Sequence, residues 1–280
     1  MDCTIEQLFE TFLPIYRKVE ISELVDNPGS RKCFMTKLRE ICAKEEMKST
    51  SIVTCTNKPH CIDNIFQNYQ NQVWGKKELI IILNRDDIDI YKWEKKAESY
   101  KNVYIYQVPQ EKSLGYCYNF SVEKANYDYI ATFDDDDYYA PNYLTDLMHA
   151  FLYTDADIVG KLTYYTYLEE KQLLILRNPF QEYRYLDDRL SFLDGGKKII
   201  KRKVFDQVQF RDISNLEDVF MSRDCMKKGF KIFSTDKYNI TYMRNANKDY
   251  HTWKENDDKI LSWGCSIIGQ TNDYKTSVII

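Results

Sequence analysis

The sequence contains little glycine and no glycine-rich phosphate-binding loop. Nine of its 280 residues are glycine, and neither GxGxxG nor GxxxxGK followed by Ser or Thr occurs in it. In many nucleotide-binding folds these loops bring backbone N–H groups close to the phosphates. A nucleotide bound by this chain would therefore need another counter-charge for its phosphates, such as a metal ion held by carboxylates.

Other absences limit the class of protein. The formal net charge is −4, so no basic excess indicates nucleic-acid binding. No stretch approaches the roughly 18 uncharged apolar residues of a transmembrane segment, and the acidic N-terminus lacks the signal-peptide pattern. The eight cysteines include no CxxC pair and no metal-finger spacing, which is typical of reduced thiols. We therefore expect a cytoplasmic protein.

Alternating strand and helix patterns cover residues 51–245. Short runs rich in β-branched and aromatic residues predict strands, and segments with helical periodicity separate them. The run at residues 78–83 is almost entirely apolar, which suits a parallel sheet covered on both faces. This alternation predicts an α/β, Rossmann-like fold with a mixed, mostly parallel sheet flanked by helices. Residues 162–168 and 173–176 are expected to form antiparallel strands.

Two segments flank this predicted domain. Residues 1–50 carry apolar residues at helical spacing on both sides of a turn, and they predict an N-terminal helical extension. This extension is either a hairpin packed on the main domain or a contact surface for a partner, including a second copy in a homo-oligomer. Residues 246–280 are expected to be a C-terminal tail that packs on the active site.

The most informative feature is a run of four aspartates at residues 134–137. It follows the predicted strand at residues 129–133, and Pro141 is expected to open the next helix. Open α/β sheets bind their ligands at the carboxyl ends of such strands. Adjacent carboxylates repel one another, and a hard cation such as Mg²⁺ or Mn²⁺ relieves that repulsion. An acidic run is often only a solvated loop, but its place between a buried strand and a helix favours a metal site.

Three further features are candidate functional groups. Glu217 and Asp218 begin a predicted helix, where acids either complement the helix dipole or offer a general base. The basic stretch at residues 197–203 either guards a sheet edge or faces a diphosphate or anionic acceptor. His251 is either structural or a ligand of an Mn²⁺-like ion.

In this order, the motifs resemble those of family-2 glycosyltransferases with the GT-A fold. The likeness covers residues 51–245. The matching segments are the first-strand end at residues 53–57, the helix and strand at 119–133, the DxD-like run at 134–137, the acceptor-side stretch at 195–205, and an ED motif at Glu217 and Asp218.

The resemblance implies roles for the acidic residues. Asp136 would hold a divalent metal, Mn²⁺ or Mg²⁺, bound to the donor diphosphate. Asp134 and Asp135 would contact the nucleotide sugar. Asp218 would be the catalytic base beside Glu217. His251 would add a metal ligand, as in some related enzymes.

The resemblance also implies which residues meet the nucleotide. Thr54 and Thr56 belong to the motif that contacts the base. Asn84 stands where many members have aspartate, and asparagine both donates and accepts hydrogen bonds. The identity of the base, in a UDP- or dTDP-sugar, is therefore left open.

Taken as a whole, the resemblance implies a bacterial enzyme that moves a sugar from a nucleotide-diphosphate sugar to a hydroxyl of a glycan or other acceptor, with inversion. Such enzymes build cell-surface or spore-coat polysaccharide, which also suggests a place at the inner membrane face or the spore coat. The QxxRW motif of processive members is absent, which favours one sugar per encounter. The alternatives are a GT-A-like nucleotidyltransferase and a non-catalytic binding module whose aspartates form a solvated loop.

Overall fold

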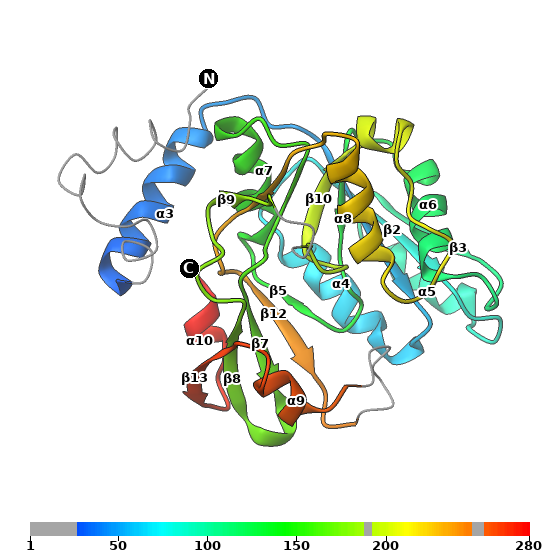
Figure 1. Ribbon diagram of the computed structural model, residues 1–280. Coiled ribbons are helices and arrows are strands. Elements are labelled where there is room, and N and C mark those ends of the chain that lie inside the picture. Colours follow the sequence, from blue (N-terminus) through cyan, green and yellow to red (C-terminus); the bar gives the residue numbers. More distant parts are fainter. Residues whose placement is uncertain (1–26, 188–191, 248–254) are drawn as a thin grey trace.

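The computed structural model describes residues 27–187, 192–247 and 255–280. Within these ranges the chain forms two sheets with helices around them (Figure 1). The larger sheet has eight strands in the order β3-β2-β1-β4-β10-β6-β11-β9, and the smaller has five in the order β13-β8-β7-β12-β5. Across the described ranges, none of the helices has the length and apolar character needed to cross a bilayer.

Parallel strands joined by helices make up the first half of the larger sheet. They are β1 (Thr50–Thr56), β2 (Lys77–Leu83), β3 (Val103–Gln107) and β4 (Tyr129–Thr132). The connections contain η1 (Pro59–Cys61) and α4 (Ile62–Asn71), then α5 (Ile90–Ala97), then α6 (Leu114–Lys124). This arrangement confirms the predicted α/β fold with a mainly parallel sheet flanked by helices.

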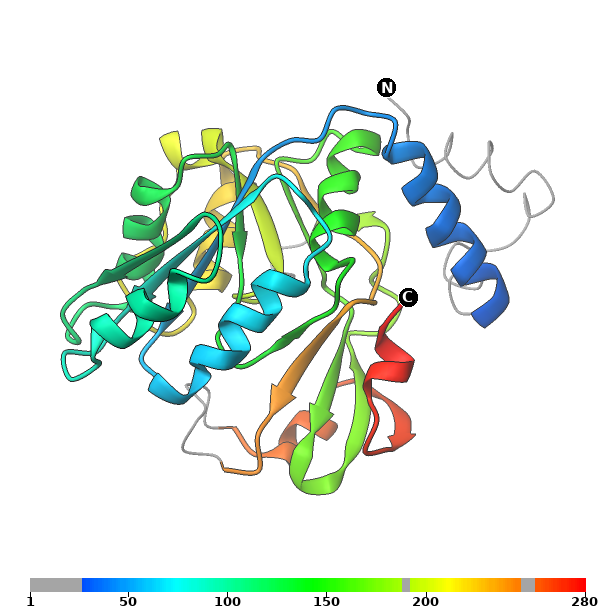
Figure 2. The ribbon, with the colours of Figure 1, turned by 180° about the vertical axis from the view of Figure 1, so that it is seen from behind.

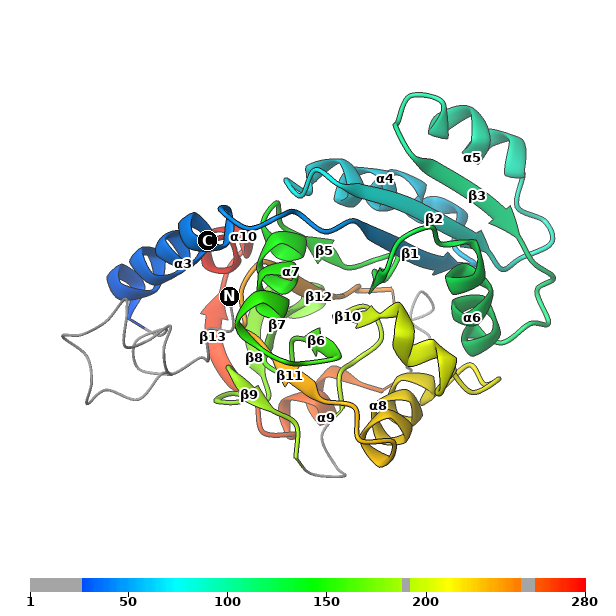
Figure 3. The same ribbon diagram turned by 90° about the horizontal axis from the view of Figure 1, so that it is seen from above.

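Side chains of these strands alternate between two apolar layers. Ile52 and Ile81 pack with residues of α4, α5 and α7 (Tyr143–Tyr153). Val53 and Ile82 face the other way and pack with residues of α6 and α8 (Glu217–Lys227). Figure 3 shows the helices on both sides of the sheet. Successive residues of a strand point to opposite faces, so a fully apolar strand such as β2 is stable only when both faces are covered.

The second half of the larger sheet contains a strand that runs in the opposite direction. β10 (Lys198–Lys201) is antiparallel to β4 and to β6 (Ile158–Gly160), and η3 (Arg202–Asp206) follows it. β11 (Ile232–Ser234) and β9 (Arg184–Tyr185) complete the sheet. One interpretation of the basic stretch, a solvated sheet edge, is therefore wrong. β10 is an interior strand, and Lys197 and Lys198 are only 2% and 1% exposed.

The smaller sheet lies below the larger one in Figure 1. β7 (Tyr164–Leu168) and β8 (Leu173–Arg177) are antiparallel across η2 (Glu169–Lys171), as predicted. β12 (Ile240–Arg244) pairs with β7 and with β5 (Tyr138–Tyr139), and β13 (Ser266–Gln270) pairs with β8. The helix expected after Pro141 is present as α7, which begins at Tyr143, and residues 138–139 before it pair with β12.

Helix α3 (Pro28–Cys42) lies beside α7 and the C-terminus (Figure 2). The Arg39 guanidinium donates to both carboxylate oxygens of Asp146, at 2.8 and 2.9 Å, and to the Ile280 carbonyl. The tail contributes α9 (Asp257–Leu261) and α10 (Lys275–Val278). Residues 1–26 of the expected extension lie outside the described residues, so the domain boundaries and the homo-oligomer stay predictions.

Candidate active site

The acidic run lies where β4 ends, beside the end of β1. Val53 pairs with Thr132 in the sheet, and the Phe133 N–H donates to the Val53 carbonyl at 3.0 Å. The residues after Phe133 therefore continue alongside the last residues of β1. There the Thr56 hydroxyl donates to Asp135 Oδ2 at 2.5 Å. This contact confirms that the aspartates stand at the carboxyl edge of the sheet.

A lysine from the first connection lies between two of the aspartates. Lys58 Nζ is 2.9 Å from Asp135 Oδ1 and 2.7 Å from Asp136 Oδ2. The Lys58 side chain is 15% exposed, and its own backbone N–H donates to Thr56 Oγ1 at 3.0 Å. Thr56, Lys58 and Asp135 thus form a closed set of contacts that holds the ammonium group in place.

The other two aspartates face a second lysine. Lys197 Nζ lies 3.8 Å from Asp134 Oδ2 and 3.5 Å from Asp137 Oδ2. Asp137 is fully buried, and its Oδ1 accepts from the Met243 N–H at 3.0 Å. Its Oδ2 has no hydrogen-bond donor among the described residues. The four carboxylates are thus divided between two ammonium groups from different elements.

Burial disfavours the charged form of the aspartate side chains in the site. It raises the pKa of Asp135 to about 6, with repulsion from Asp136 adding to the shift and Lys58 opposing it. Burial also raises the pKa values of Asp134 and Asp137, and Lys197 opposes the shift in both. A group whose charged form is disfavoured by desolvation gains from any added positive charge nearby. The run therefore favours binding of a cation.

A tight turn before β10 touches the first aspartate. The Asp134 N–H donates to the Tyr139 hydroxyl at 2.7 Å, that hydroxyl donates to the Gly196 carbonyl at 2.8 Å, and the Gly196 N–H donates to Asp134 Oδ2 at 3.1 Å. A Cβ atom on Gly196 would lie 2.4 Å from the Tyr139 hydroxyl and 2.5 Å from Asp134 Cγ. Only glycine fits this approach, which fixes the turn against the acidic run.

The second acidic pair begins α8. Burial raises the pKa of Glu217 to about 7, with further contributions from Asp218 and, more weakly, from Asp134. Burial also raises the pKa of Asp218, and Lys198 opposes that shift. Lys198 Nζ donates to the carbonyls of Leu193 and Asp194, at 3.0 and 3.1 Å. The acidic run and the acidic pair are thus close enough for their charges to interact, and the ammonium group of the buried Lys198 lies near the pair.

The remaining predicted residues lie at different distances from these groups. Thr54 is buried within β1, at 1% exposure. Asn84 follows β2, and its backbone N–H donates to the Thr56 carbonyl at 2.8 Å while its side chain donates to the Pro109 carbonyl at 2.8 Å. Asn84 therefore lies at the same sheet edge as Thr56. His251 lies outside the described residues, so its role as a metal ligand stays a prediction.

The carboxylates fit a hard divalent ion chemically. They are oxygen ligands, which Mg²⁺ and Mn²⁺ prefer, and the buried Asp137 Oδ2 accepts no hydrogen bond from the residues that the structure describes and is 3.5 Å from the Lys197 ammonium group. Within the described ranges, no three His, Cys, Asp or Glu side chains converge on a point that could hold a metal. A bound ion would therefore share ligands with a second molecule, and phosphate oxygens are suitable for this.

A small polar pocket adjoins the acidic run. Its volume is about 160 Å³, and amide side chains of α4 line it together with Asp136, Asp137, Tyr138, Tyr274 and Lys275. In this pocket wall, Asn64 and Asn68 donate to the backbone carbonyl of Asp137, at 3.0 and 2.8 Å. Side chains of α4 and residues next to α10 therefore stand at the Asp136 side of the site.

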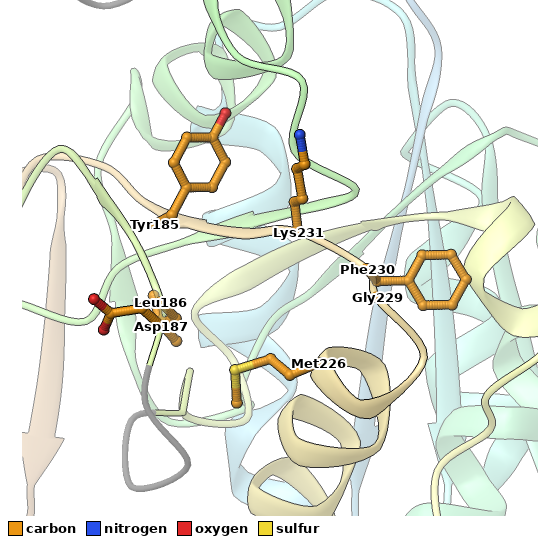
Figure 4. A pocket seen from close by; sticks show the side chains of 7 residues that line it. All are labelled: Tyr185, Leu186, Asp187, Met226, Gly229, Phe230 and Lys231. Atoms are coloured by element: carbon orange, nitrogen blue, oxygen red, sulfur yellow. The ribbon is translucent and has the colours of Figure 1, made fainter.

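A larger pocket lies at the opposite edge of the sheet. The cavity has a volume of about 390 Å³. Tyr185, Met226 and Lys231 line it together with Leu186, Asp187, Gly229 and Phe230 (Figure 4). Tyr185 belongs to β9, and the other lining residues follow β9, lie near the end of α8 or precede β11. β11 points in the same direction as β4, because β6 is parallel to β11 and both β6 and β4 are antiparallel to β10. The start of β11 therefore lies far from the carboxyl end of β4.

Reasoning from the sequence missed the lysines that organise the site. The sequence patterns did not single out Lys58, although it follows a strand end by two residues and precedes a helix, where a ligand-facing side chain is common. Lys197 and Lys198 belong to a basic stretch for which a ligand-facing role was one of two interpretations. No local pattern indicated Asn64 and Asn68, because amides on a helix surface carry no distinctive spacing.

A doubly wound α/β domain with carboxylates gathered at this sheet edge has the architecture of the GT-A glycosyltransferases. The family model described as glycosyl transferase family 2 matches residues 50–209. This chain belongs to that family, which confirms the family and the enzyme class expected from the ordered motifs. The matched range includes the acidic run and β10 but ends before α8. A comparison with curated proteins found no match.

Solved structures share the fold at low sequence identity. Residues 1–349 of TarS from S. aureus have a TM-score of 0.55 and 13% identity, over 70% of this chain and 60% of that one. The same TarS fragment in complex with UDP-GlcNAc has a TM-score of 0.53 and 14% identity, over 72% and 60%. Mannosyltransferase PcManGT from Pyrobaculum calidifontis, in complex with GDP-Man and Mn²⁺, has a TM-score of 0.53 and 11% identity, over 78% and 66%. This chain thus spans about 60% of the TarS fragment.

Proposed function

We propose that this protein transfers a sugar from a nucleoside-diphosphate sugar, a UDP- or dTDP-sugar, to an acceptor hydroxyl, with help from Mn²⁺ or Mg²⁺ and with inversion. One observation carries the proposal: β10 and the turn before it connect the acidic run at the end of β4 with the acidic pair at the start of α8. Asp134 is in direct contact with Gly196, and the ammonium group of Lys198 interacts electrostatically with Glu217 and Asp218. A donor site and a base site therefore share one sheet edge.

Under this proposal the acidic run binds the diphosphate through a shared cation. Asp136, with Asp134 and Asp135 beside it, would hold the ion, and His251 is a further candidate ligand. The bound ion would supply charge stabilisation for the leaving diphosphate. Thr56 and Asn84, at the ends of β1 and β2, would lie toward the nucleoside. The neighbours' complexes with UDP-GlcNAc and with GDP-Man and Mn²⁺ support this class of donor.

The α8 pair serves the acceptor. Asp218 accepts the proton of the acceptor hydroxyl as its oxygen attacks the anomeric carbon, and the bond to the diphosphate breaks on the opposite face. A single displacement of this kind inverts the anomeric centre. The raised pKa of Asp218 makes it a stronger base than an exposed aspartate. The acceptor is a glycan or another hydroxyl compound, in the synthesis of a surface polysaccharide.

The test separates donor binding from transfer. Asp218→Asn should keep nucleotide binding but lose about 10²–10⁴-fold in transfer rate, since general-base help is of that size. Asp136→Ala should lose the metal-dependent part of UDP or dTDP binding, measured by calorimetry with and without Mn²⁺. Asp187→Asn, at the opposite sheet edge, is the matched control and should behave as wild type. NMR of the product anomer reports the stereochemistry.

Two results would contradict this function. Full transfer activity in Asp218→Asn would show that Asp218 is not the base. Nucleotide binding that is unchanged by both Mn²⁺ and EDTA would show that no shared cation takes part. Formation of a nucleotide sugar from a sugar phosphate and a nucleoside triphosphate would instead identify a nucleotidyltransferase. Binding of nucleotide without any transfer to a panel of acceptors would favour a binding module.

A further inference from the structure

Lys58 lies between two of the aspartates that would hold a cation under the proposed function. Its ammonium group contacts Asp135 and Asp136 at 2.9 and 2.7 Å, and the three side chains are 15%, 8% and 15% exposed. An exposed ion pair would be weakened by solvent, whereas this pair is mostly shielded. Thr56 helps to hold the Lys58 side chain in place, because its hydroxyl accepts from the Lys58 backbone N–H and donates to Asp135. The lysine is thus part of the site and not a passing surface contact.

The two lysines divide the work between them. Lys197 faces Asp134 and Asp137, and its ammonium group also lies 4.8 Å from the ring centroids of Tyr164 and Tyr242, inside the fold. Lys58 stands on the more open side, next to Asp136. A lysine ammonium group is positively charged at neutral pH, and the two carboxylates that contact Lys58 favour this charged form.

We propose that Lys58 competes with the divalent ion for Asp136, so that the ion binds tightly only together with a nucleoside diphosphate. The inference rests on the proposed function. An ammonium nitrogen 2.7 Å from Asp136 Oδ2 excludes a metal from that oxygen, and a metal on the other oxygen of the same carboxylate would meet like-charge repulsion. A diphosphate changes this balance, because its negative oxygens pair with the displaced ammonium and add ligands to the ion. Lys58 is a positioning residue that makes metal and donor bind as a pair.

The competition predicts effects of opposite sign for one substitution. Lys58→Met keeps the length of the side chain and removes its charge. Mn²⁺ should then bind the nucleotide-free protein about tenfold more tightly or better, since one desolvated competing charge is lost. With Mn²⁺ at saturation, UDP should bind more weakly, because the ammonium that would pair with its phosphates is gone. A purely structural lysine would weaken both events or neither.

Thermodynamic linkage supplies an internal check. The factor by which UDP tightens Mn²⁺ binding must equal the factor by which Mn²⁺ tightens UDP binding. In wild type we expect this factor to exceed about 10, and in Lys58→Met it should fall by at least the gain in nucleotide-free Mn²⁺ affinity. Lys58→Arg keeps the charge and should retain most of the wild-type factor.

The experiment measures free Mn²⁺ by electron paramagnetic resonance during titrations, with and without UDP, dTDP or GDP. It uses the full chain as wild type, Lys58→Met and Lys58→Arg. Lys231→Met, whose lysine pairs with Asp155 at the opposite sheet edge, is the matched control. Thermal melts check that each variant is folded, and Lys58→Gln replaces the Met variant if that one does not fold.

Each outcome decides the proposal. Opposite shifts in Mn²⁺ and nucleotide affinity in Lys58→Met or Lys58→Gln, with an unchanged Lys231→Met, support it. Equal Mn²⁺ affinity with and without nucleotide in wild type overturns it, as does a folded charge-removed variant whose nucleotide-free Mn²⁺ affinity is unchanged or weaker. Failure of wild type to bind Mn²⁺ or any nucleotide overturns the proposed function as well, and thus differs from failure of the competition alone.

Discussion

We expect Glu217→Gln to stabilise the fold by an amount that depends on pH. Glu217 is 6% exposed at the start of α8. Burial, followed by repulsion from Asp218, raises its pKa from the ordinary 4.5 to about 7. The folded state therefore holds this proton more tightly than the unfolded state does. The resulting stabilisation is complete below pH about 4.5 and is lost as the pH rises through about 7.

The size of the effect follows from the shift. One pKa unit corresponds to about 1.36 kcal/mol of free energy. The shift of the Glu217 carboxyl from 4.5 to about 7 then corresponds to about 3 kcal/mol over the whole range, and about 2.5 kcal/mol of it falls between pH 5 and pH 8. Glutamine is neutral at every pH and has no such loss. The difference in unfolding free energy between Glu217→Gln and wild type should therefore increase by about 2.5 kcal/mol from pH 5 to pH 8.

Urea unfolding at pH 5, 6, 7 and 8 measures this difference directly. Contributions from titrating groups that do not interact with Glu217, such as Asp135, are common to both proteins and cancel to first order. Glu111 lies in an exposed turn, and Glu111→Gln is the matched control, expected to change stability by less than about 0.5 kcal/mol. A difference that is constant with pH would refute the reasoning. So would a carboxyl carbon resonance of Glu217 that titrates near 4.5.

Two other substitutions test how the site is held. Gly196→Ala should destabilise the fold by about 3 kcal/mol or more in thermal or urea unfolding, because the new Cβ would lie 2.4 Å from the Tyr139 hydroxyl. Gly29→Ala is the control, because the atom nearest to its new Cβ would be 3.6 Å away. Equal stabilities of the two variants would contradict the close approach at Gly196. Arg202→Met should cost about 3 kcal/mol, because the guanidinium donates to carbonyls at the end of α6 and after it, at 2.6–3.0 Å. Lys203→Met, at a 61% exposed neighbour, should cost less than about 1 kcal/mol, and a similar cost for both would show that these bonds contribute little.

The sequence predicted the first half of the fold well, for a physical reason. Strands of a parallel sheet covered on both faces must be apolar throughout, and the connecting helices must show one apolar face. Residues 78–83 and the helix at Ile62–Asn71 follow these patterns closely, and the structure has both. The edge position of the acidic run followed from the same logic, since a polar run after a buried strand must leave the sheet at its carboxyl end.

Features that depend on long-range pairing could not be predicted in this way. β5 has only two residues, and pairing with β12 determines that they form a strand before α7 begins. The lysines at the start of β10 looked like exposed charges because lysine is seldom buried without a partner. Their partners, Asp134 and Asp137 for Lys197, come from another strand end. The local sequence around each residue does not indicate these long-range contacts.

The direction of β10 explains how one site is made from two acidic groups that lie far apart in the sequence. Because β10 is antiparallel to β4, its first residues meet the end of β4, where the aspartates are. Successive side chains of an extended segment point to opposite sides. Lys197 accordingly faces the acidic run, whereas Lys198 faces the other side, with Glu217 and Asp218 among the charges that act on it. A strand parallel to β4 would place these lysines at the opposite edge of the sheet. The antiparallel direction of β10 thus determines both how far apart the two acidic groups lie and which lysine each group faces.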